Sequence, residues 1–420
     1  MFEKLYVHLE GKININQYGG IRSGSTAHYL TKLNHFMLKA LEQTGNILII
    51  TFIDMKKGFD LVDHSVLAYI LMKYEVPHSD ILWILNFLSN RSQVVKNGKN
   101  MSDSDYVTCG TPAGTKLAPL LFVLLINEIL ESVEVEFIKN NPNVLECGFI
   151  DDLTIVECVN SKENPQTQNF LDFIGKISNS IKMVINSEKC ELFIVDPSRQ
   201  KISNLWNFKI LGKSVPKITS ATLLGVKFNN KLKWDDQVNN MCNKANRKLF
   251  IINKIRQSGF DQKEQIRAYL TYIRPNLEYC SVVWGAGLND KLSSKIERVQ
   301  KRALSIILRK KVDRNNYDEI MEELKIASLS IRRELALSKF GRKLFMSKRF
   351  RNFLPQLVDS SSQRKLRNRK EIMHQPCYKN ERYRLSTLPA IINDINHEYI
   401  EKGTLFGWKV EDALIVEGII

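Results

Sequence analysis

The apolar run ILIITFI at Ile47–Ile53, which ends at Asp54, constrains the fold more than any other part of the chain. β-branched and aromatic residues without polar alternation are typical of a strand that is buried on both faces. Two more strand-like runs, Val144–Phe149 and Leu153–Val159, meet at a pair of aspartates. Helical patterns lie between the strands, but a helix does not follow each strand as it would in a Rossmann unit. Residues 1–233 are therefore predicted to form an α/β (α+β) fold around an antiparallel sheet.

Helix and turn signals fill the intervals between these strands. Ser79–Ser92 opens with an N-cap serine and has helical spacing, and Leu117–Val133 is a long apolar helix. Gln93–Lys96 and Tyr106–Cys109 flank a polar turn that contains Asn-Gly, which predicts a hairpin. The remaining elements expected here are a helix at Gln166–Ile185 and strands at Glu191–Val195 and Thr222–Phe228.

After Trp234 the pattern is helical, with basic residues on the polar faces. The predicted helices are Asp235–Gln257, Gln262–Trp284, Lys291–Leu308, Tyr317–Lys325 and Ser328–Lys348. We divide this part of the chain into a helical region at 234–310 and a basic helical extension at 311–420. Within the extension, a basic run from Arg364 to Lys370 is expected to be a linker or an arm.

The positive net charge of the chain indicates which classes of partner it can bind. The 420 residues include 61 Lys and Arg against 45 Asp and Glu, so the formal net charge is +16 at pH 7. A surface this positive attracts polyanions, which means nucleic acid or an anionic membrane. The longest apolar runs, Ile47–Ile53 and Leu117–Ile126, are far shorter than the roughly 20 residues that span a bilayer. We therefore expect no membrane span.

The cysteines and the N-terminal residues predict an intracellular location, in the cytoplasm or the nucleus. Seven cysteines are scattered without CxxC pairs, which argues against a disulfide framework and a structural zinc site. Met1–Leu5 is charged and no apolar segment follows it, so no secretory signal is expected.

Three carboxylates stand where predicted strands end, namely Asp54, Asp151 and Asp152. Carboxylates gathered at adjacent strand ends repel each other unless a cation neutralises them. One or two carboxylates together with substrate phosphates are the usual ligands of Mg²⁺, and two such ions can stabilise both oxygens of a phosphoryl displacement. Each aspartate taken alone is more often a turn former or a helix N-cap than a metal ligand. The order of the three aspartates along the chain favours metal binding over the role of a turn former or helix N-cap.

The order of motifs resembles the reverse transcriptase of non-LTR (LINE-type, jockey-like) retrotransposons, from residue 1 to beyond 340. FIDMKKGFDLVDH at Phe52–His64 resembles the first catalytic block, and FIDD at Phe149–Asp152 matches the aromatic-x-Asp-Asp turn. GTPAGTKLAPLLFVLLINEIL at Gly110–Leu130 is similar to the Pro-Gln-Gly block between them. Further similar segments are Asn16–Leu30 (fingers), Ile185–Val195, Leu223–Phe228, Tyr272–Trp284 and Ile296–Leu304.

This resemblance implies a right-hand polymerase with a palm, partial fingers, an all-helical thumb and a C-terminal extension. Its catalytic residues would be Asp54, Asp151 and Asp152, which hold two Mg²⁺ ions (Mn²⁺ is an alternative), and Lys189, which protonates pyrophosphate. The nucleotide-binding residues would be Phe59, Arg22, Lys56, Ala113 and Gly114, and the primer grip would be Leu224 and Gly225. The implied partners are an RNA template, a DNA primer, their RNA–DNA hybrid and dNTPs.

The sequence departs from the family pattern at several positions. Ala113 stands where the family has a Gln, Gly58 replaces an alanine beside Phe59, and Gly24 stands where a basic residue is frequent. Loss of the Gln amide removes a hydrogen-bonding surface of the nucleotide pocket. The chain also begins in the middle of the fingers, because the family's Arg-Pro-Ile-Ser strand is expected before Met1. These departures are typical of a fragment or a decayed copy.

Basic residues on two predicted helices are expected to bind the nucleic acid. They are Lys244, Arg247, Lys248, Lys254 and Arg256 on one helix, and Arg298, Lys301 and Arg302 on the other. Any single run of this kind is more often a solvated helix face. The aromatic residues Trp234, Tyr272, Tyr279 and Trp284 are expected to lie in the core rather than to stack on bases.

The sequence thus predicts an RNA-directed DNA polymerase. The first alternative is a catalytically decayed remnant that keeps the fold and binds nucleic acid without polymerising. A weaker alternative is an RNA-binding protein resembling an intron maturase, which the retrotransposon-like tail disfavours. The oligomeric state is left open.

Overall fold

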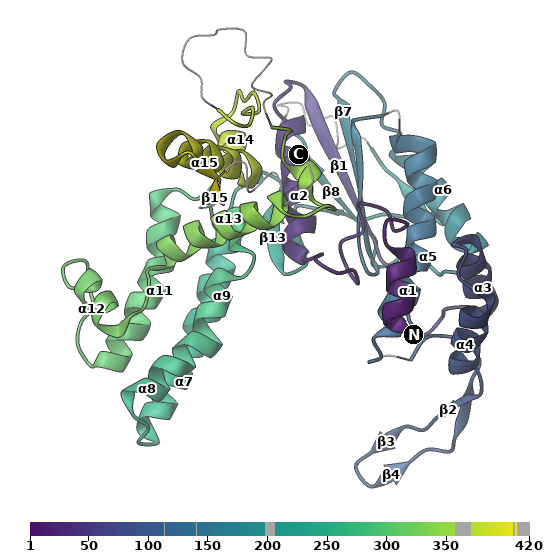
Figure 1. The fold of residues 1–420 in the computed structure, drawn as a ribbon, viewed down its shortest axis with the longest axis horizontal. Helices are drawn as coiled ribbons and strands as arrows, with labels where there is room; N and C mark the ends of the chain where they lie inside the picture. Colours follow the sequence, from purple (N-terminus) through teal and green to yellow (C-terminus); the bar gives the residue numbers. More distant parts are fainter. Residues whose placement is uncertain (113, 140, 198–205, 358–370, 406–407, 410–420) are drawn as a thin grey trace. The chain divides into compact units, whose positions relative to one another are not determined.

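A computed structural model describes residues 1–112, 114–139, 141–197, 206–357, 371–405 and 408–409 (Figure 1). The chain is a mixture of helices and strands, as predicted. Its internal contacts divide it into two units. The first consists of Met1–Tyr29 and Gln43–Thr219, and the second of Leu30–Glu42 and Ser220–Ile420. The predicted divisions after residues 233 and 310 stay predictions.

A five-stranded sheet with the order β11-β8-β1-β7-β6 forms the centre of the first unit. The strands are β1 (Asn46–Ile53), β6 (Val144–Phe149), β7 (Asp152–Asn160), β8 (Glu191–Val195) and β11 (Lys217–Ile218). The central strand β1 is antiparallel to both β7 and β8, and all of its side chains except that of Phe52 are buried. The prediction of a doubly buried strand is therefore confirmed. The predicted antiparallel order fails only at the edge, where β11 runs parallel to β8.

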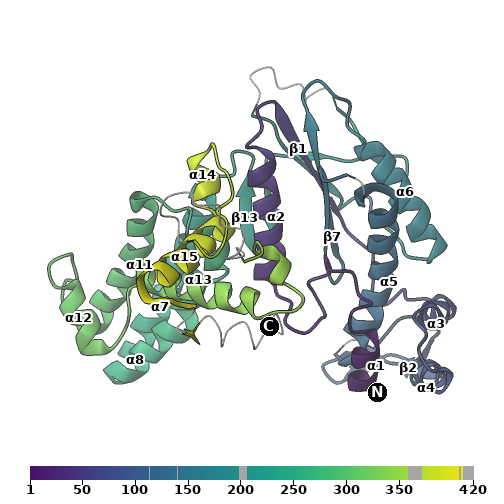
Figure 2. The same ribbon diagram turned by 45° about the horizontal axis from the view of Figure 1, so that its top comes forward.

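Helix α5 (Leu117–Val133) supplies much of the core of this unit. It is apolar on all sides and nearly all of its side chains are buried, as expected for a helix without a solvated face. It continues into a π-helical turn, η1 (Glu134–Ile138). Helix α6 (Thr167–Ser180) lies on the same side of the sheet (Figure 2). It ends before the predicted Ile185, because that residue forms a β-bridge with Met55 instead.

The smaller elements of the first unit include a projecting ribbon. The helices are α1 (Phe2–Leu9), α3 (His64–Lys73) and α4 (His78–Leu88). After α4, β2 (Arg91–Gln93) pairs with β5 (Asp105–Val107), and β3 (Lys96–Asn97) pairs with β4 (Asn100–Met101). Figure 1 shows this ribbon extending beyond α4. The predicted hairpin is thus present, with its outer strands at other residues than expected. A small hairpin of β9 (Lys209–Ile210) and β10 (Lys213–Ser214) completes the unit.

The second unit is mainly helical. Its long helices are α7 (Asp235–Gln257), α11 (Asp290–Leu308), α13 (Leu329–Phe345) and α15 (Thr387–Lys402). Its shorter elements are α8 (Gln262–Ala268), η3 (Tyr269–Ile273), α9 (Arg274–Glu278), α10 (Ser281–Trp284), α12 (Tyr317–Leu324), η4 (Arg351–Phe353) and α14 (Glu381–Arg384). Its strands are β12 (Ser220–Leu223), β13 (Val226–Asn229), β14 (Thr404–Leu405) and β15 (Trp408–Lys409). Helix α2 (Thr26–Ala40) begins in the first unit and continues in the second.

Two predicted elements of this unit are wrong. Thr222–Phe228 is a hairpin rather than one strand, because Leu224 and Gly225 both have a positive φ (44° and 83°) and form a two-residue turn. The single helix predicted at Gln262–Trp284 is broken. Pro275 lacks the N–H that a continuous helix needs, and the π-helical η3 precedes it. At Cys280, φ is 50°, which ends α9 before α10 begins.

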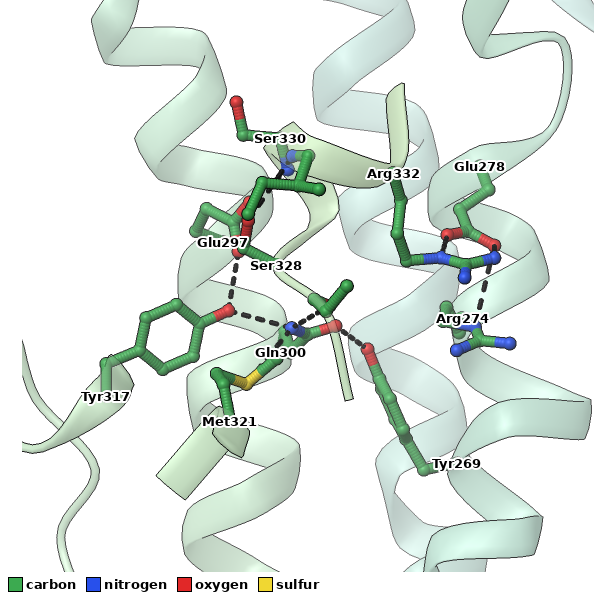
Figure 3. A network of polar contacts seen from close by, with 12 residues as sticks. Tyr269, Arg274, Glu278, Glu297, Gln300, Tyr317, Met321, Ser328, Ser330 and Arg332 are labelled. Atoms are coloured by element: carbon green, nitrogen blue, oxygen red, sulfur yellow. Dashed lines mark hydrogen bonds and ion pairs between the residues drawn. The ribbon is translucent and has the colours of Figure 1, made fainter. Parts of the chain in front are cut away.

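A polar network joins the helices of the second unit (Figure 3). The buried amide of Gln300 accepts a hydrogen bond from the hydroxyl of Tyr269 and donates one to the hydroxyl of Tyr317 at 2.8 Å. Tyr317 in turn donates to Glu297 at 2.6 Å, and the same carboxylate accepts from the backbone N–H of Ser330 at 2.7 Å. These contacts connect η3, α11, α12 and α13.

Among the described residues, none of the helices has the length and apolar content that crossing a bilayer requires.

Candidate active site

The register of the central sheet brings the positions of the three aspartates together. Ile53, the last residue of β1, is paired with Leu153 of β7, so the next residue, Asp54, follows on toward the position of Asp152. Asp152 is paired with Phe149 and closes the β6–β7 hairpin, in which Asp151 is one of the two turn residues. The sequence-based expectation that these aspartates stand at adjacent strand ends therefore agrees with the strand pairing.

The electrostatics of Asp152 reflect this proximity. Its pKa is raised to about 6 by desolvation, and then by the negative charges of Asp151 and Asp54. A cation bound here would relieve the repulsion and favour the ionised carboxylate.

The chemistry of this donor set fits a hard divalent cation, since carboxylate oxygens are the ligands that Mg²⁺ and Mn²⁺ take. In the described ranges, no group of three His, Cys, Asp or Glu side chains is arranged to hold a metal ion as it stands. The fit therefore rests on the identity of the donors and on their mutual repulsion.

A buried side chain that sequence reasoning missed holds the Asp-Asp turn. The side-chain oxygen of Gln17 accepts hydrogen bonds from the N–H of Gly19 at 3.1 Å and from the N–H of Ile150 at 3.2 Å. Gly19 can approach only because it lacks a side chain: a Cβ there would lie 2.6 Å from the Ile150 nitrogen. The residue between Gln17 and Gly19 is also hydrogen-bonded to the β6–β7 hairpin, since the backbone N–H of Tyr18 donates to the carbonyl of Gly148 at 2.8 Å. Ile150 has a φ of 59°, a strained conformation for a β-branched residue.

The segment after β1 is fixed by the chain around Lys189. The N–H of Lys56 donates to the carbonyl of Val184 at 2.8 Å, and the N–H of Asn186 donates to the carbonyl of Asp54 at 2.8 Å. The N–H of Lys189 closes a turn on Asn186 at 3.0 Å. The side chains of Lys56 and Lys189 are both exposed. The structure thus brings the backbone of Lys189 close to that of Asp54.

The loop before α5 is tied to the turn that carries Phe59. The N–H of Thr111 donates to the carbonyl of Phe59 at 2.8 Å, and the ring of Phe59 stacks on Phe122 at 4.8 Å between centroids. Further along this loop, Gly114 has a φ of 86°, which favours glycine. Ala113 lies outside the described residues.

Arg22 is engaged with the first helix. Its guanidinium forms an ion pair with Glu3 and lies 4.6 Å from the centre of the Tyr6 ring. Its backbone N–H also donates to the Tyr6 hydroxyl at 2.8 Å. A triphosphate contact by Arg22 would therefore require the ion pair to open.

Comparison with known proteins identifies the family. The family model described as reverse transcriptase (RNA-dependent DNA polymerase) matches residues 2–228, which is more than half of the chain. The chain belongs to the reverse transcriptase family. A relative from Drosophila melanogaster, the probable RNA-directed DNA polymerase from transposon X-element, is 21% identical over 266 residues. The alignment covers 61% of this chain and 28% of that protein, so the chain spans less than a third of the relative's length. The predicted resemblance to a retrotransposon enzyme is confirmed.

The solved structures that resemble this chain include telomerases. Apo telomerase from Candida tropicalis is 12% identical with a TM-score of 0.45, and the match covers 76% of this chain and 50% of that one. Telomerase from Candida albicans, in complex with a fragment of telomeric RNA, is 13% identical with a TM-score of 0.42. That match covers 78% of this chain and 56% of the other.

Packing in the fold explains two glycines that depart from the family pattern. A Cβ at Gly58 would stand 2.6 Å from the Phe122 ring, so the ring fills the space that an alanine side chain would need. A Cβ at Gly24 would stand 2.2 Å from the carbonyl oxygen of Tyr18, so no basic side chain fits at this position.

In the second unit, the predicted primer-grip turn is held by Tyr279. The hydroxyl of Tyr279 donates to the carbonyl of Leu224 at 2.8 Å, and its ring lies 3.1 Å from the place of a Cβ on Gly225. Tyr279 is 44% exposed, and Tyr272 is 53% exposed. The expectation that both are core residues is therefore wrong, whereas Trp234 and Trp284 are buried as expected.

The predicted nucleic-acid-binding cations differ in what their side chains contact. Lys244 and Lys248 line one cavity on α7, together with Gly225 and Tyr279. Lys301 of α11 instead lies over the ring of Tyr317, 4.3 Å from its centre. Of the predicted cations, Arg247, Lys254, Arg298 and Arg302 are exposed and lie outside that cavity.

Proposed function

We propose that this chain catalyses RNA-directed DNA synthesis for a non-LTR retrotransposon. The 3′-hydroxyl oxygen of a DNA primer forms a bond to the α-phosphorus of a dNTP, pyrophosphate leaves, and the hydroxyl proton is lost. Asp54, Asp151 and Asp152 would hold two Mg²⁺ ions, which when bound neutralise charge on the reacting oxygens. The main support is the sheet register, which makes Asp54 and the Asp151–Asp152 turn neighbours inside a chain of this family.

In this proposal the first unit contains the palm and partial fingers, and the helices after Trp234 form the thumb and a C-terminal extension. Phe59 would lie under the sugar and exclude a ribose 2′-hydroxyl. Lys56 and Arg22 would contact the triphosphate, Gly114 would let the backbone approach the nucleotide, and Ala113 would line the nucleotide pocket. Lys189 would give a proton to the leaving pyrophosphate, and Leu224 and Gly225 would position the primer.

The nucleic-acid partners of this proposal are an RNA template and the RNA–DNA hybrid that the reaction produces. Positively charged helices of the second unit would bind the phosphates without sequence preference, as Lys and Arg side chains do. The proposed contacts come from Lys244, Arg247, Lys248, Arg298, Lys301 and Arg302.

Extension of a labelled DNA primer on an RNA template tests the proposal. The purified chain should add nucleotides with Mg²⁺ and not with EDTA, and Asp151→Asn should abolish the addition. Asp172→Asn is the matched control, because this exposed aspartate on α6 accepts its hydrogen bond from Gln168 through Oδ1, which an asparagine keeps. Undiminished synthesis by Asp151→Asn would refute the assignment of the site.

A second candidate function is a remnant that binds nucleic acid without polymerising it. Two observations favour it: Gly24 has no room for a basic side chain, and the guanidinium of Arg22 is paired with Glu3. Both reduce the positive charge available to a triphosphate. The remnant would shift an RNA–DNA hybrid in a gel while adding no nucleotide under any divalent ion.

A further inference from the structure

Helix α7 borders a groove within the second unit. The contacts proposed above involve only some of the residues that line this groove. A cavity of about 370 Å³ begins at Gly225 and runs between α7 and the η3–α9 segment. Lys244 and Lys248 line it from α7, and Tyr272 and Tyr279 line it from the opposite side. Its volume lies within the range of about 300–1,000 Å³ that is usual for ligand clefts.

The groove continues beyond this cavity toward the end of α7. A second cavity of about 270 Å³ shares Thr271 and Tyr272 with the first and reaches Ile255 and Phe260. We call the two cavities together the α7 groove. Lysines, amides and tyrosines line much of its first half. Its second half is lined by the apolar and aromatic residues Ile255, Phe260 and Ala268 together with the charged pair Glu264 and Arg267, and Tyr272 lines both halves.

The aromatic side chains of the α7 groove are open to solvent. Tyr272 is 53% exposed and Phe260 is 56% exposed. Large exposed rings that line a concave surface are a common feature of binding sites. An aromatic face beside a cation suits a flat ring that is attached to a phosphate, which is the chemistry of a nucleotide.

The charge of α7 favours an anionic ligand. Its acidic residues, Asp235 and Asp236, are confined to the first turn, whereas the rest of the helix carries only cations. Lys244 is exposed at the groove, and the ammonium of Lys248 is oriented by a hydrogen bond of 3.1 Å to the side-chain oxygen of Asn276. The carboxylate that lines the second cavity, Glu264, is neutralised by an ion pair with Arg267 at 2.7 Å.

We propose that the α7 groove binds single-stranded nucleic acid. Lys244 and Lys248 contact the phosphates, and Tyr272 and Phe260 stack on unpaired bases. The stacking part of this contact is specific to an unpaired strand, because the base faces of a duplex are already stacked inside the helix and are not available to a protein ring. This inference deepens the proposed function, on which it rests for the assignment of nucleic acid as the partner.

Fluorescence anisotropy with the full-length chain tests the groove. The probes are labelled oligo(dT) and oligo(rU) of about 20 nucleotides, together with a DNA duplex and an RNA–DNA hybrid of equal length. All are measured in EDTA without nucleotide, so that binding is independent of the metal site. Binding of the single strands should depend on Tyr272 and binding of the duplex and the hybrid should not, and comparison of the dT and rU probes distinguishes a DNA strand from an RNA strand.

Substitutions at the groove should lower this affinity in a specific pattern. Tyr272→Ala should weaken single-strand binding by about fivefold or more, while Tyr272→Phe keeps the ring and the affinity. Lys244→Ala should reduce the slope of log affinity against log salt by about 0.7, the value for one phosphate contact on a single strand. The matched controls are Phe250→Ala on α7 and Lys291→Ala on α11. Both side chains are exposed but line neither cavity, and these variants should bind like the unmodified chain.

Two results would overturn the proposal that the α7 groove binds single-stranded nucleic acid. One is a Tyr272→Ala variant that loses duplex and hybrid affinity by the same factor as single-strand affinity, and the other is a folded Tyr272→Ala variant with undiminished single-strand affinity. Failure of the polymerase proposal looks different, because a chain without primer extension would still show the Tyr272 dependence. Circular dichroism of each variant checks that it is folded.

Discussion

The ring of Phe122 occupies the space in which a side chain on Gly58 would stand, with Cζ 2.6 Å from the place of a Cβ. Phe122 is fully buried in α5 and also stacks on Phe59, the residue next to Gly58. The glycine and the phenylalanine are therefore complementary in volume. In the sequence, glycine in place of the family alanine suggests a decayed copy. In the fold, the packing of Phe122 against Gly58 explains the glycine.

Gly58→Ala should destabilise the chain by about 1–3 kcal/mol, because an added methyl group must displace a ring that is enclosed on all sides. Urea denaturation followed by circular dichroism measures the change in the free energy of unfolding.

The matched background for this test is Phe122→Leu, which removes the ring atoms nearest to Gly58. In that background, Gly58→Ala should cost much less, so that a double-mutant cycle gives a favourable coupling energy. An equal cost in both backgrounds would mean that the ring is not what excludes the side chain.

Much of the first unit could be predicted from the sequence, because its strands and helices have uniform patterns. The run at Ile47–Ile53 has the composition of a doubly buried strand and forms one, and the bounds of α5 agree with the predicted Leu117–Val133. The second unit was predicted less well wherever a single residue decides the backbone. Leu224 adopts a positive φ, which residue type alone does not indicate, and the predicted strand becomes a hairpin.

The aspartates of the candidate site could be found because each follows or precedes an apolar strand. The support around them could not be predicted in this way. Gln17 is 133 positions from Ile150 in the sequence, and no local pattern marks a buried glutamine as the acceptor for a distant N–H. In the sequence, a polar residue between Asn16 and Tyr18 looks like any loop residue. The exposure of Tyr272 was missed for a similar reason, since aromatic residues at helical spacing usually face the core.

Gln17→Leu should slow primer extension more than it affects binding of the primer–template. The substitution leaves the N–H groups of Gly19 and Ile150 without their side-chain acceptor, at a cost of about 1–3 kcal/mol for an unsatisfied buried group. The turn that carries Asp151 then loses its support, and we expect a lower kcat in a primer-extension assay that the native chain supports.

Gln168→Leu is the control for this variant. The amide of Gln168 also bonds to backbone atoms, those of Lys209, but on the exposed side of α6. Its loss should leave kcat unchanged. If both variants lowered kcat by the same factor, the effect would be general destabilisation rather than support of the turn.

The raised pKa of Asp152 predicts how stability depends on pH without metal. Its pKa is about 6 in the folded chain, because of desolvation and the charges of Asp151 and Asp54, against an ordinary value of 3.8. Between these two values the folded state binds more protons than the unfolded state, so the free energy of unfolding falls as the pH rises through this window. Asp152→Asn should therefore be more stable than the native chain at pH 7 in EDTA. We expect a gain of about 1 kcal/mol, less than the full shift implies, because the exposed side chain is screened by solvent.

Urea denaturation from about pH 4 to 7 checks this. The gain should be smallest at the acidic end, where the carboxyl is protonated in the folded state and partly protonated in the unfolded state. Magnesium should reverse the order, because a cation that binds only the folded native chain raises its free energy of unfolding and leaves Asp152→Asn unaffected. Asp172→Asn should keep the native pH dependence and the native response to magnesium, since its carboxylate accepts from Gln168 on α6, away from the strand ends. A native chain that magnesium does not stabilise at pH 7 would argue against a metal site at these aspartates.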